Sequence, residues 1–319
     1  MVATVMPEKE EPRSGPCAAV RESPVLDILY RPSGSALALV TAILLACTAG
    51  GAQRAEPASI AATDEPRGWL VIEGGSYPIN QTVAEKFREL IGGADSKVLL
   101  VPTALADSEM SVESRTDGAR GTGEFMGLRN CEIFNTHDRT RANSEEFANR
   151  IRTAKGIWFN GGRPGRIAEA YLDTRTHREL LSFYKNGGVI GGSSAGAMIL
   201  SSFLVRGGIE NEDFRNYISQ KNRVGFGFLP NAAIDVHIGQ RPNGEADLTQ
   251  IVSAYPGVLG IGVEAGVAAV VHGHQLEVIG RPRGRVAVTD GQLHDGKPYF
   301  FLKPGDRYDL VQRAVISPR

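Results

Sequence analysis

The chain has 319 residues, of which 42% are hydrophobic and 22% are charged, and its formal net charge is −1. Because the charges balance and no basic stripe stands out, we expect no nucleic-acid or polyanion partner. Cys131 is the one cysteine outside the N-terminal 55 residues, so we expect it to be a small buried hydrophobe without a disulfide partner. No Cys/His cluster has zinc-ligand spacing, so we expect no metal.

The N-terminal segment has the composition of an export signal. Residues 1–34 lack periodicity, Arg21 and Arg31 precede an apolar run over 36–46, and that run ends in small residues. This order is typical of a secretory signal, and the run is too short for a membrane span. We therefore expect a leader over 1–55, a linker over 56–67 and one domain over 68–319, with the protein periplasmic or secreted.

Two features leave the nature of this leader open. Leu44-Leu45-Ala46-Cys47 is similar to a bacterial lipoprotein box, in which Cys47 would carry lipid and anchor the protein to a membrane. The segment is unusually long for a signal, so translation could begin later. The alternative is an N-terminal hydrophobic helix that packs on the core.

The body alternates apolar runs with segments of helical spacing. The periodicity predicts strands over 69–72, 97–102, 132–134 and 156–159, and helices over 81–91, 107–127, 144–154, 165–172 and on to 184. Short β runs follow from 258 onward, over 258–263, 268–271, 276–279, 286–288 and 299–302. We expect an α/β fold, a three-layer sandwich around a mainly parallel sheet, with C-terminal hairpins on one side.

The sequence Gly192-Ser193-Ser194-Ala195-Gly196 lies where a buried strand turns directly into a helix. Small residues suit such an elbow because it leaves little room for Cβ atoms. The turn would expose the hydroxyl of Ser194 at the carboxyl end of the sheet, where sites form in parallel sheets. We interpret Ser194 as a nucleophile; the alternative is a packing turn whose serine caps the helix.

A nucleophilic serine needs a base, and His237 is the strongest candidate. It follows an apolar run in Asp235-Val236-His237 and opens an irregular segment, whereas the other five histidines lie in polar helices, loops or turns. A histidine at the end of a strand can hold the proton that the serine gives up.

Three segments together resemble the cyanophycinase and dipeptidase E family of serine peptidases. They are Gly192–Ala197, like the family's Gly-Thr-Ser-Ala-Gly-Ala; Asp235–Ile238, like Asp-Gln-His-Phe; and Leu259–Glu264, like Leu-Gly-Ile-Gly-Ile-Asp-Glu. The resemblance implies a class I glutamine-amidotransferase-like fold with Ser194, His237 and Glu264 as the triad. Glu210 and Asp235 stay open as alternatives for the acid.

The resemblance also implies how substrate is held. The backbone amides of Gly162 and Ala195 would form the oxyanion hole, and Arg163, Asp235 and Arg241 would contact a peptide substrate. The family's Gly-Gly-Asp-Gln reads Gly161-Gly162-Arg163-Pro164 here, and its three arginines after the histidine reduce to Arg241. We therefore expect a related activity on peptide or β-aspartyl bonds rather than hydrolysis of cyanophycin, a β-linked Asp–Arg polymer.

The sequence thus predicts an exported serine-type peptidase that needs no cofactor, and the resemblance allows a homodimer. One rival is an esterase of the α/β-hydrolase type, which shares the Gly-x-Ser-x-Gly pattern but usually has its histidine near the C-terminus. The other rival is a non-catalytic binding module on the same fold.

Overall fold

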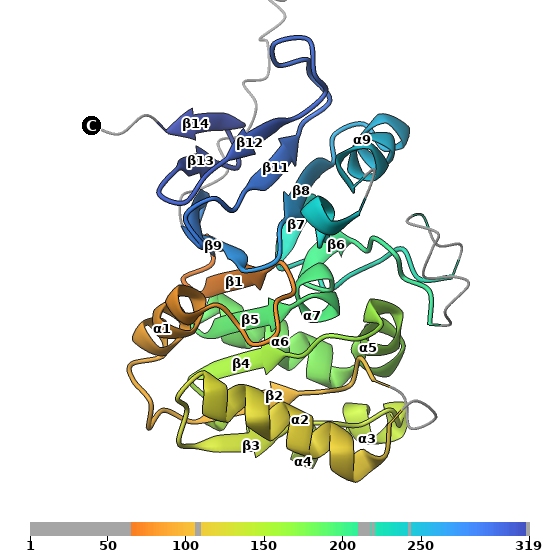
Figure 1. Ribbon diagram of the computed structural model, residues 1–319. Helices are drawn as coiled ribbons and strands as arrows, with labels where there is room; N and C mark the ends of the chain where they lie inside the picture. The colour runs from red at the N-terminus through yellow and green to blue at the C-terminus, as the bar shows by residue number, and fades with distance from the viewer. Residues whose placement is uncertain (1–64, 106–109, 210–217, 219–220, 242–243, 317–319) are drawn as a thin grey trace, which may run out of the picture. The chain divides into compact units, whose positions relative to one another are not determined.

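The computed structural model describes residues 65–105, 110–209, 218, 221–241 and 244–316 (Figure 1). The expected leader, most of the linker, Cys47 and Glu210 lie outside these residues. Within the part described, no helix is both long and apolar enough to cross a bilayer.

Five parallel strands form one half of a nine-stranded sheet, in the spatial order β1-β5-β4-β2-β3. Their carboxyl ends lie along the same edge of the sheet, as expected for parallel neighbours. Their bounds are Trp69–Glu73 (β1), Val98–Val101 (β2), Cys131–Ile133 (β3), Gly156–Phe159 (β4) and Val189–Ser193 (β5). Cys131 is exposed at the start of the edge strand β3, which corrects the expectation that it is buried.

Antiparallel strands continue this sheet beyond β1. Strand β9 pairs with β1, and β10, β13 and β14 follow outward. Their bounds are Val267–His272 (β9), Gln275–Gly280 (β10), Arg307–Asp309 (β13) and Ala314–Ile316 (β14). Strands β13 and β14 have three residues each, too few to show a hydrophobic period in the sequence.

A second, five-stranded sheet contains the remaining strands in the order β12-β11-β8-β7-β6. Strand β8, Leu259–Val263, pairs in parallel with β7, Leu229–Val236, and antiparallel with β11, Val286–Thr289. The edge strands are β6, Ser201–Phe203, and β12, Phe300–Leu302. Part of the C-terminal β sequence therefore builds a separate sheet around β7, instead of extending the first sheet.

Helices cover both faces of the parallel strands, which confirms the three-layer α/β arrangement. Alternate residues of the strands face opposite layers: Val71 and Trp158 pack with α1 and α2, whereas Ile72 and Phe159 belong to the other core. The helices are Gln81–Leu90 (α1), Val112–Phe125 (α2), Arg139–Asn143 (α3), Glu145–Asn149 (α4), Pro164–Tyr171 (α5), Arg175–Lys185 (α6), Ala195–Met198 (α7) and Gly244–Ala254 (α9), with 3-10 turns Arg150–Thr153 (η1) and Ile238–Gln240 (η2).

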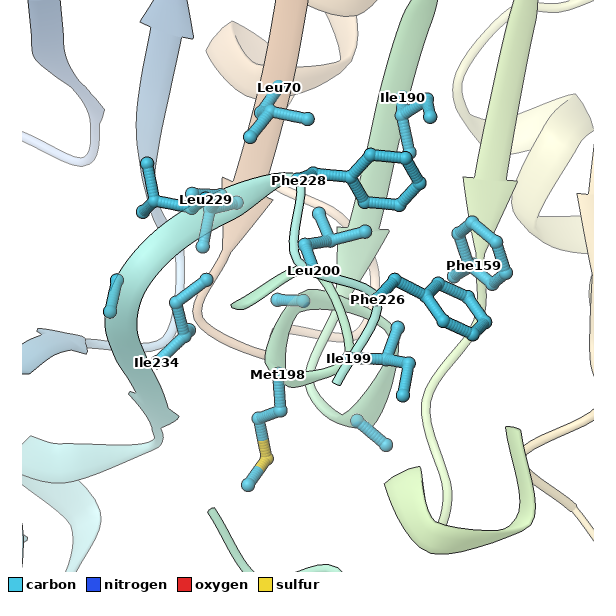
Figure 2. Packing of buried hydrophobic residues seen from close by; sticks show 14 of the residues in the cluster. Leu70, Phe159, Ile190, Met198, Ile199, Leu200, Phe226, Phe228, Leu229 and Ile234 are labelled. Carbon is cyan, nitrogen blue, oxygen red and sulfur yellow. The ribbon is translucent and has the colours of Figure 1, made fainter. Parts of the chain in front are cut away.

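The short helix α7 is buried between the two sheets. Figure 2 shows Met198, Ile199 and Leu200 among apolar side chains of the first sheet and of the segment that enters β7. All three are fully buried. This packing fixes the position of α7 against β7, and therefore brings the start of α7 near the end of β7.

Candidate active site

The elbow predicted at Ser194 is present, and its glycines are required by close backbone contacts. Ser194 has φ 55° and ψ −121° between β5 and α7. A Cβ on Gly192 would lie 2.2 Å from the Gly196 carbonyl oxygen, and a Cβ on Gly196 would lie 2.1 Å from that of Phe159. A non-glycine residue at such a φ stores strain of about 1–3 kcal/mol, which the surrounding packing must hold.

The side chains of Ser194 and His237 meet at the carboxyl end of the sheets. Ser194 Oγ lies 3.0 Å from His237 Nε2, within the reach of a hydrogen bond. His237 follows β7 with φ 55°, and its backbone N–H donates to the Gly74 carbonyl at 3.1 Å. The imidazole packs so closely on Gly75 that a Cβ there would lie 2.1 Å from its Cε1 atom.

The other ring nitrogen of His237 faces an amide. Nδ1 lies 3.1 Å from Gln240 Oε1; Gln240 ends the 3-10 turn η2, and His237 is the residue that precedes this turn. The turn folds back because the Gln240 N–H donates to the His237 carbonyl at 3.0 Å. The sequence analysis missed Gln240, since a polar side chain three residues after a histidine in an irregular segment carries no recognisable pattern.

Glu264, expected as the catalytic acid, does not reach the imidazole. Its carboxylate is 3% exposed and accepts hydrogen bonds from Arg281 at 3.0 Å and from Arg285 at 2.6 Å. It also lies against the turn after the histidine, because a Cβ on Gly239 would be 2.7 Å from Glu264 Oε1. Glu264 therefore contacts the backbone that carries His237, while its charge is matched by two arginines.

Asp235, expected to contact substrate, is fully buried behind His237. It forms an ion pair with Arg241 and accepts the Val236 N–H at 2.9 Å. Burial raises the pKa of the Asp235 carboxyl to about 7, although the positive charge of Arg206 acts in the opposite direction. Arg241, also expected at the substrate, is directed to this buried carboxylate instead.

Arg163 and the expected oxyanion donors lie around the loop that follows β4. The N–H of Arg163 donates to the Ala104 carbonyl at 2.8 Å. Ala195 is the first residue of α7, so its N–H has no carbonyl partner within the helix. Gly161 is the residue of this loop that approaches Ser194, since a Cβ there would lie 3.3 Å from Ser194 Cβ.

A cleft of about 460 Å³ opens beside Ser194 and His237. Its wall is largely apolar and includes Tyr77, which is 88% exposed, and Trp158 from β4. Arg115 of α2 also lines it, and is 2% exposed, with one guanidinium N–H donated to the Leu105 carbonyl. Gly161 belongs to the lining, whereas Gly162, Arg163, Asp235 and Arg241 do not.

Glu73 shapes the loop that forms one wall of this cleft, and the sequence analysis did not single it out. The residue ends β1 and is fully buried. Its carboxylate accepts hydrogen bonds from the N–H groups of Gly75 and Ser76 at 2.9 and 3.0 Å, and from the N–H of Gly266 at 3.3 Å. Glu73 thus holds the loop on which the His237 ring rests.

The described residues contain no cluster of three or more His, Cys, Asp or Glu side chains that could hold a metal ion. The site itself brings together a hydroxyl, an imidazole and the backbone amides at the start of α7. This set is sufficient for acyl transfer, in which a serine attacks a carbonyl carbon and amides stabilise the developing oxyanion.

Known proteins with similar sequences are cyanophycinases. The chain is 28% identical over 228 residues to a cyanophycinase of Geminocystis herdmanii (strain PCC 6308), covering 70% of this chain and 80% of that protein. It is 28% identical over 206 residues to a cyanophycinase of Synechococcus elongatus, covering 64% of this chain and 62% of that protein.

Two solved structures share the fold. A peptidase from an acI-B1 Actinobacterium has a TM-score of 0.60 and 23% identity, over 77% of this chain and 98% of the other. A peptidase E-type protein of Listeria monocytogenes EGD-e has a TM-score of 0.50 and 18% identity, over 67% and 98%. Residues 70–279, which include both Ser194 and His237, match peptidase family S51. The chain therefore belongs to peptidase family S51 and is a serine-type peptidase, as the cyanophycinase and dipeptidase E motifs had predicted.

Proposed function

We propose that this protein is an exported peptidase in which Ser194 is the nucleophile and His237 the general base. The distance of 3.0 Å between Ser194 Oγ and His237 Nε2 carries the proposal, because it allows the proton to pass directly. The same distance favours an enzyme over a binding module that has lost its chemistry.

The reaction proceeds through an acyl-enzyme. His237 Nε2 takes the proton of Ser194, and the oxygen of Ser194 forms a bond with the carbonyl carbon of the substrate. The C–N bond then breaks, and His237 returns the proton to the leaving amine. A water molecule, deprotonated in turn by His237, hydrolyses the ester and restores the serine hydroxyl.

Gln240 is the group that we assign to orient the base. Nε2 can accept a proton only if the hydrogen of the neutral ring is on Nδ1, and Gln240 Oε1 lies 3.1 Å from that nitrogen. A neutral amide selects this tautomer without adding a negative charge. Neither Glu264 nor Asp235 is needed in this role, since both carboxylates are bonded to arginines.

The oxyanion of the tetrahedral intermediate would be stabilised by the N–H of Ala195 together with an amide of the Gly161-Gly162 loop. One such donor typically contributes about 3 kcal/mol to the transition state. The substrate would be a peptide or a β-aspartyl isopeptide, in line with the cyanophycinases that the chain resembles. The signal-like N-terminal segment supports a periplasmic or secreted location.

The test combines covalent labelling with turnover. Wild-type protein should react with a fluorophosphonate probe, and both Ser194→Ala and His237→Ala should abolish the reaction while the fold is retained by circular dichroism. Labelling that persists in Ser194→Ala would show that another residue reacts. A panel of α-aspartyl and β-aspartyl dipeptides, with Leu-containing dipeptides as controls, then identifies the bond that is cleaved.

A further inference from the structure

The turn that carries His237 is closed at its base by an ion pair whose aspartate is fully buried and whose arginine is partly exposed. Asp235 is the penultimate residue of β7, and Arg241 directly follows η2, so the pair joins the two ends of a seven-residue segment. The same guanidinium nitrogen of Arg241 that contacts Asp235 also donates to the Val236 carbonyl at 3.1 Å. Both His237 and Gln240 lie inside the segment that this pair closes.

Two further charged residues surround the pair. Arg206 is 7% exposed; its Nε lies 3.6 Å from Asp235 Oδ1, and its terminal nitrogen lies 2.9 Å from Asp247 on α9. Asp247 also lies 3.8 Å from Arg241. The cluster thus contains two arginines and two aspartates, so each charge has an opposite partner, as buried charges require.

The segment needs such support because His237 has an unfavourable backbone conformation. Its φ of 55° lies in the left-handed region, which a residue with a Cβ seldom adopts without external contacts. The carbonyl before His237 accepts from Arg241, and the N–H of His237 donates to Gly74. The peptide group between Val236 and His237 is therefore held on both sides, at its carbonyl by Arg241 and at its N–H by Gly74. The next peptide group is held within the turn, where the His237 carbonyl accepts the Gln240 N–H.

We propose that Asp235 and Arg241 are positioning residues for His237, and that neither of them contacts substrate. This inference rests on the proposed role of His237 as the base. It differs from the expectation drawn from the family motif, in which both side chains would bind substrate. The full burial of Asp235 and the absence of Arg241 from the lining of the cleft support the new assignment.

The experiment separates positioning from substrate binding with a small probe. Arg241→Lys and Asp235→Asn are compared with wild type for the rate of fluorophosphonate labelling of Ser194 and for kcat and KM on the best dipeptide. If the pair positions His237, labelling and kcat fall together by about 10- to 100-fold, since a displacement of about 1 Å has this effect, while KM changes little. The double variant Asp235→Asn/Arg241→Lys should be no slower than the slower single variant.

Other outcomes would overturn the inference. A raised KM with unchanged labelling would make Arg241 a substrate contact, and unchanged labelling, kcat and KM would leave the pair without a role in the reaction. Arg129→Lys is the matched control, because Arg129 forms an exposed pair with Asp95. If Asp235→Asn does not fold, the labelling rate, kcat and KM of Arg241→Lys alone decide between positioning and substrate binding. If His237→Ala still labels, the proposed function itself fails, and the two failures are thereby distinguished.

Discussion

Replacing Gly75 by alanine should displace the imidazole of His237 from Ser194, because the atoms nearest to a Cβ at this position all belong to the His237 ring. A Cβ on Gly75 would lie 2.1 Å from His237 Cε1 and 2.3 Å from Nε2. Ordinary contact begins near 3.4 Å, so the ring must retreat by about 1.3 Å. The distance from Ser194 Oγ to His237 Nε2 is 3.0 Å, and such a shift would stretch this hydrogen bond beyond its useful range.

The expected loss for Gly75→Ala is about 100-fold in kcat/KM, the usual effect of a misplacement of this size. The rate of fluorophosphonate labelling should fall in parallel, because both reactions need the same proton transfer. The labelling rate is measured from samples quenched at successive times, and dipeptide hydrolysis is measured from the amine that it releases.

Gly93→Ala is the matched control for this substitution. Gly75 and Gly93 both have positive φ angles, +96° and +113°, but no atom lies within 4 Å of a Cβ on Gly93. Both variants therefore carry the backbone strain of alanine in this region, and only Gly75→Ala adds the clash. If the two variants retain activity within about threefold of each other, the reasoning from ring displacement is refuted.

Three further predictions concern the polar groups around the base. Gln240→Ala should lower the rate of fluorophosphonate labelling by about tenfold, because the His237 ring loses the group that orients it. Gln240→Glu should move the low-pH limb of the kcat/KM profile to higher pH, because a carboxylate favours the charged imidazole. An unchanged labelling rate in the first variant and an unchanged profile in the second would contradict the role of Gln240. Glu264→Gln should lower the free energy of unfolding by about 2 kcal/mol in urea titrations, since two arginines lose their counter-charge. It should reduce the labelling rate less than Gln240→Ala does. A larger loss of labelling in Glu264→Gln than in Gln240→Ala would restore Glu264 as the catalytic acid. The carboxyl of Asp235 has a folded-state pKa of about 7, above the value of about 3.9 in an unfolded chain. The stabilisation that the protonated carboxyl provides is therefore complete below about pH 4 and is lost as pH rises to about 7. The melting temperature of wild type, relative to that of Asp235→Asn, should fall over this range. A difference in melting temperature that does not change with pH would count against the shifted pKa.

Much of the fold could be predicted because its signals are local. The strands 97–102 and 156–159 were evident as short apolar runs, and the structure has β2 and β4 there. A helix was expected to begin at Ser144, whose side chain accepts the N–H of Phe147 in the first turn of α4. The expected helix over 107–127 begins later, at Val112, and the one over 144–154 divides into α4 and η1, because helix ends depend on caps and packing more than on periodicity.

The amino-acid sequence alone was enough to predict Ser194 as the nucleophile and His237 as its base, because an elbow of small residues and a histidine at a strand end are both recognised within a few positions. Only the tertiary structure decided which groups surround that base. Glu264, Asp235 and Gln240 are all polar residues near the ends of strands or turns, and nothing in their local sequence says which one faces Nδ1. That choice depends on arginines distant along the chain, Arg281 and Arg285 for Glu264 and Arg206 for Asp235, which pair with the carboxylates only once the sheets have assembled.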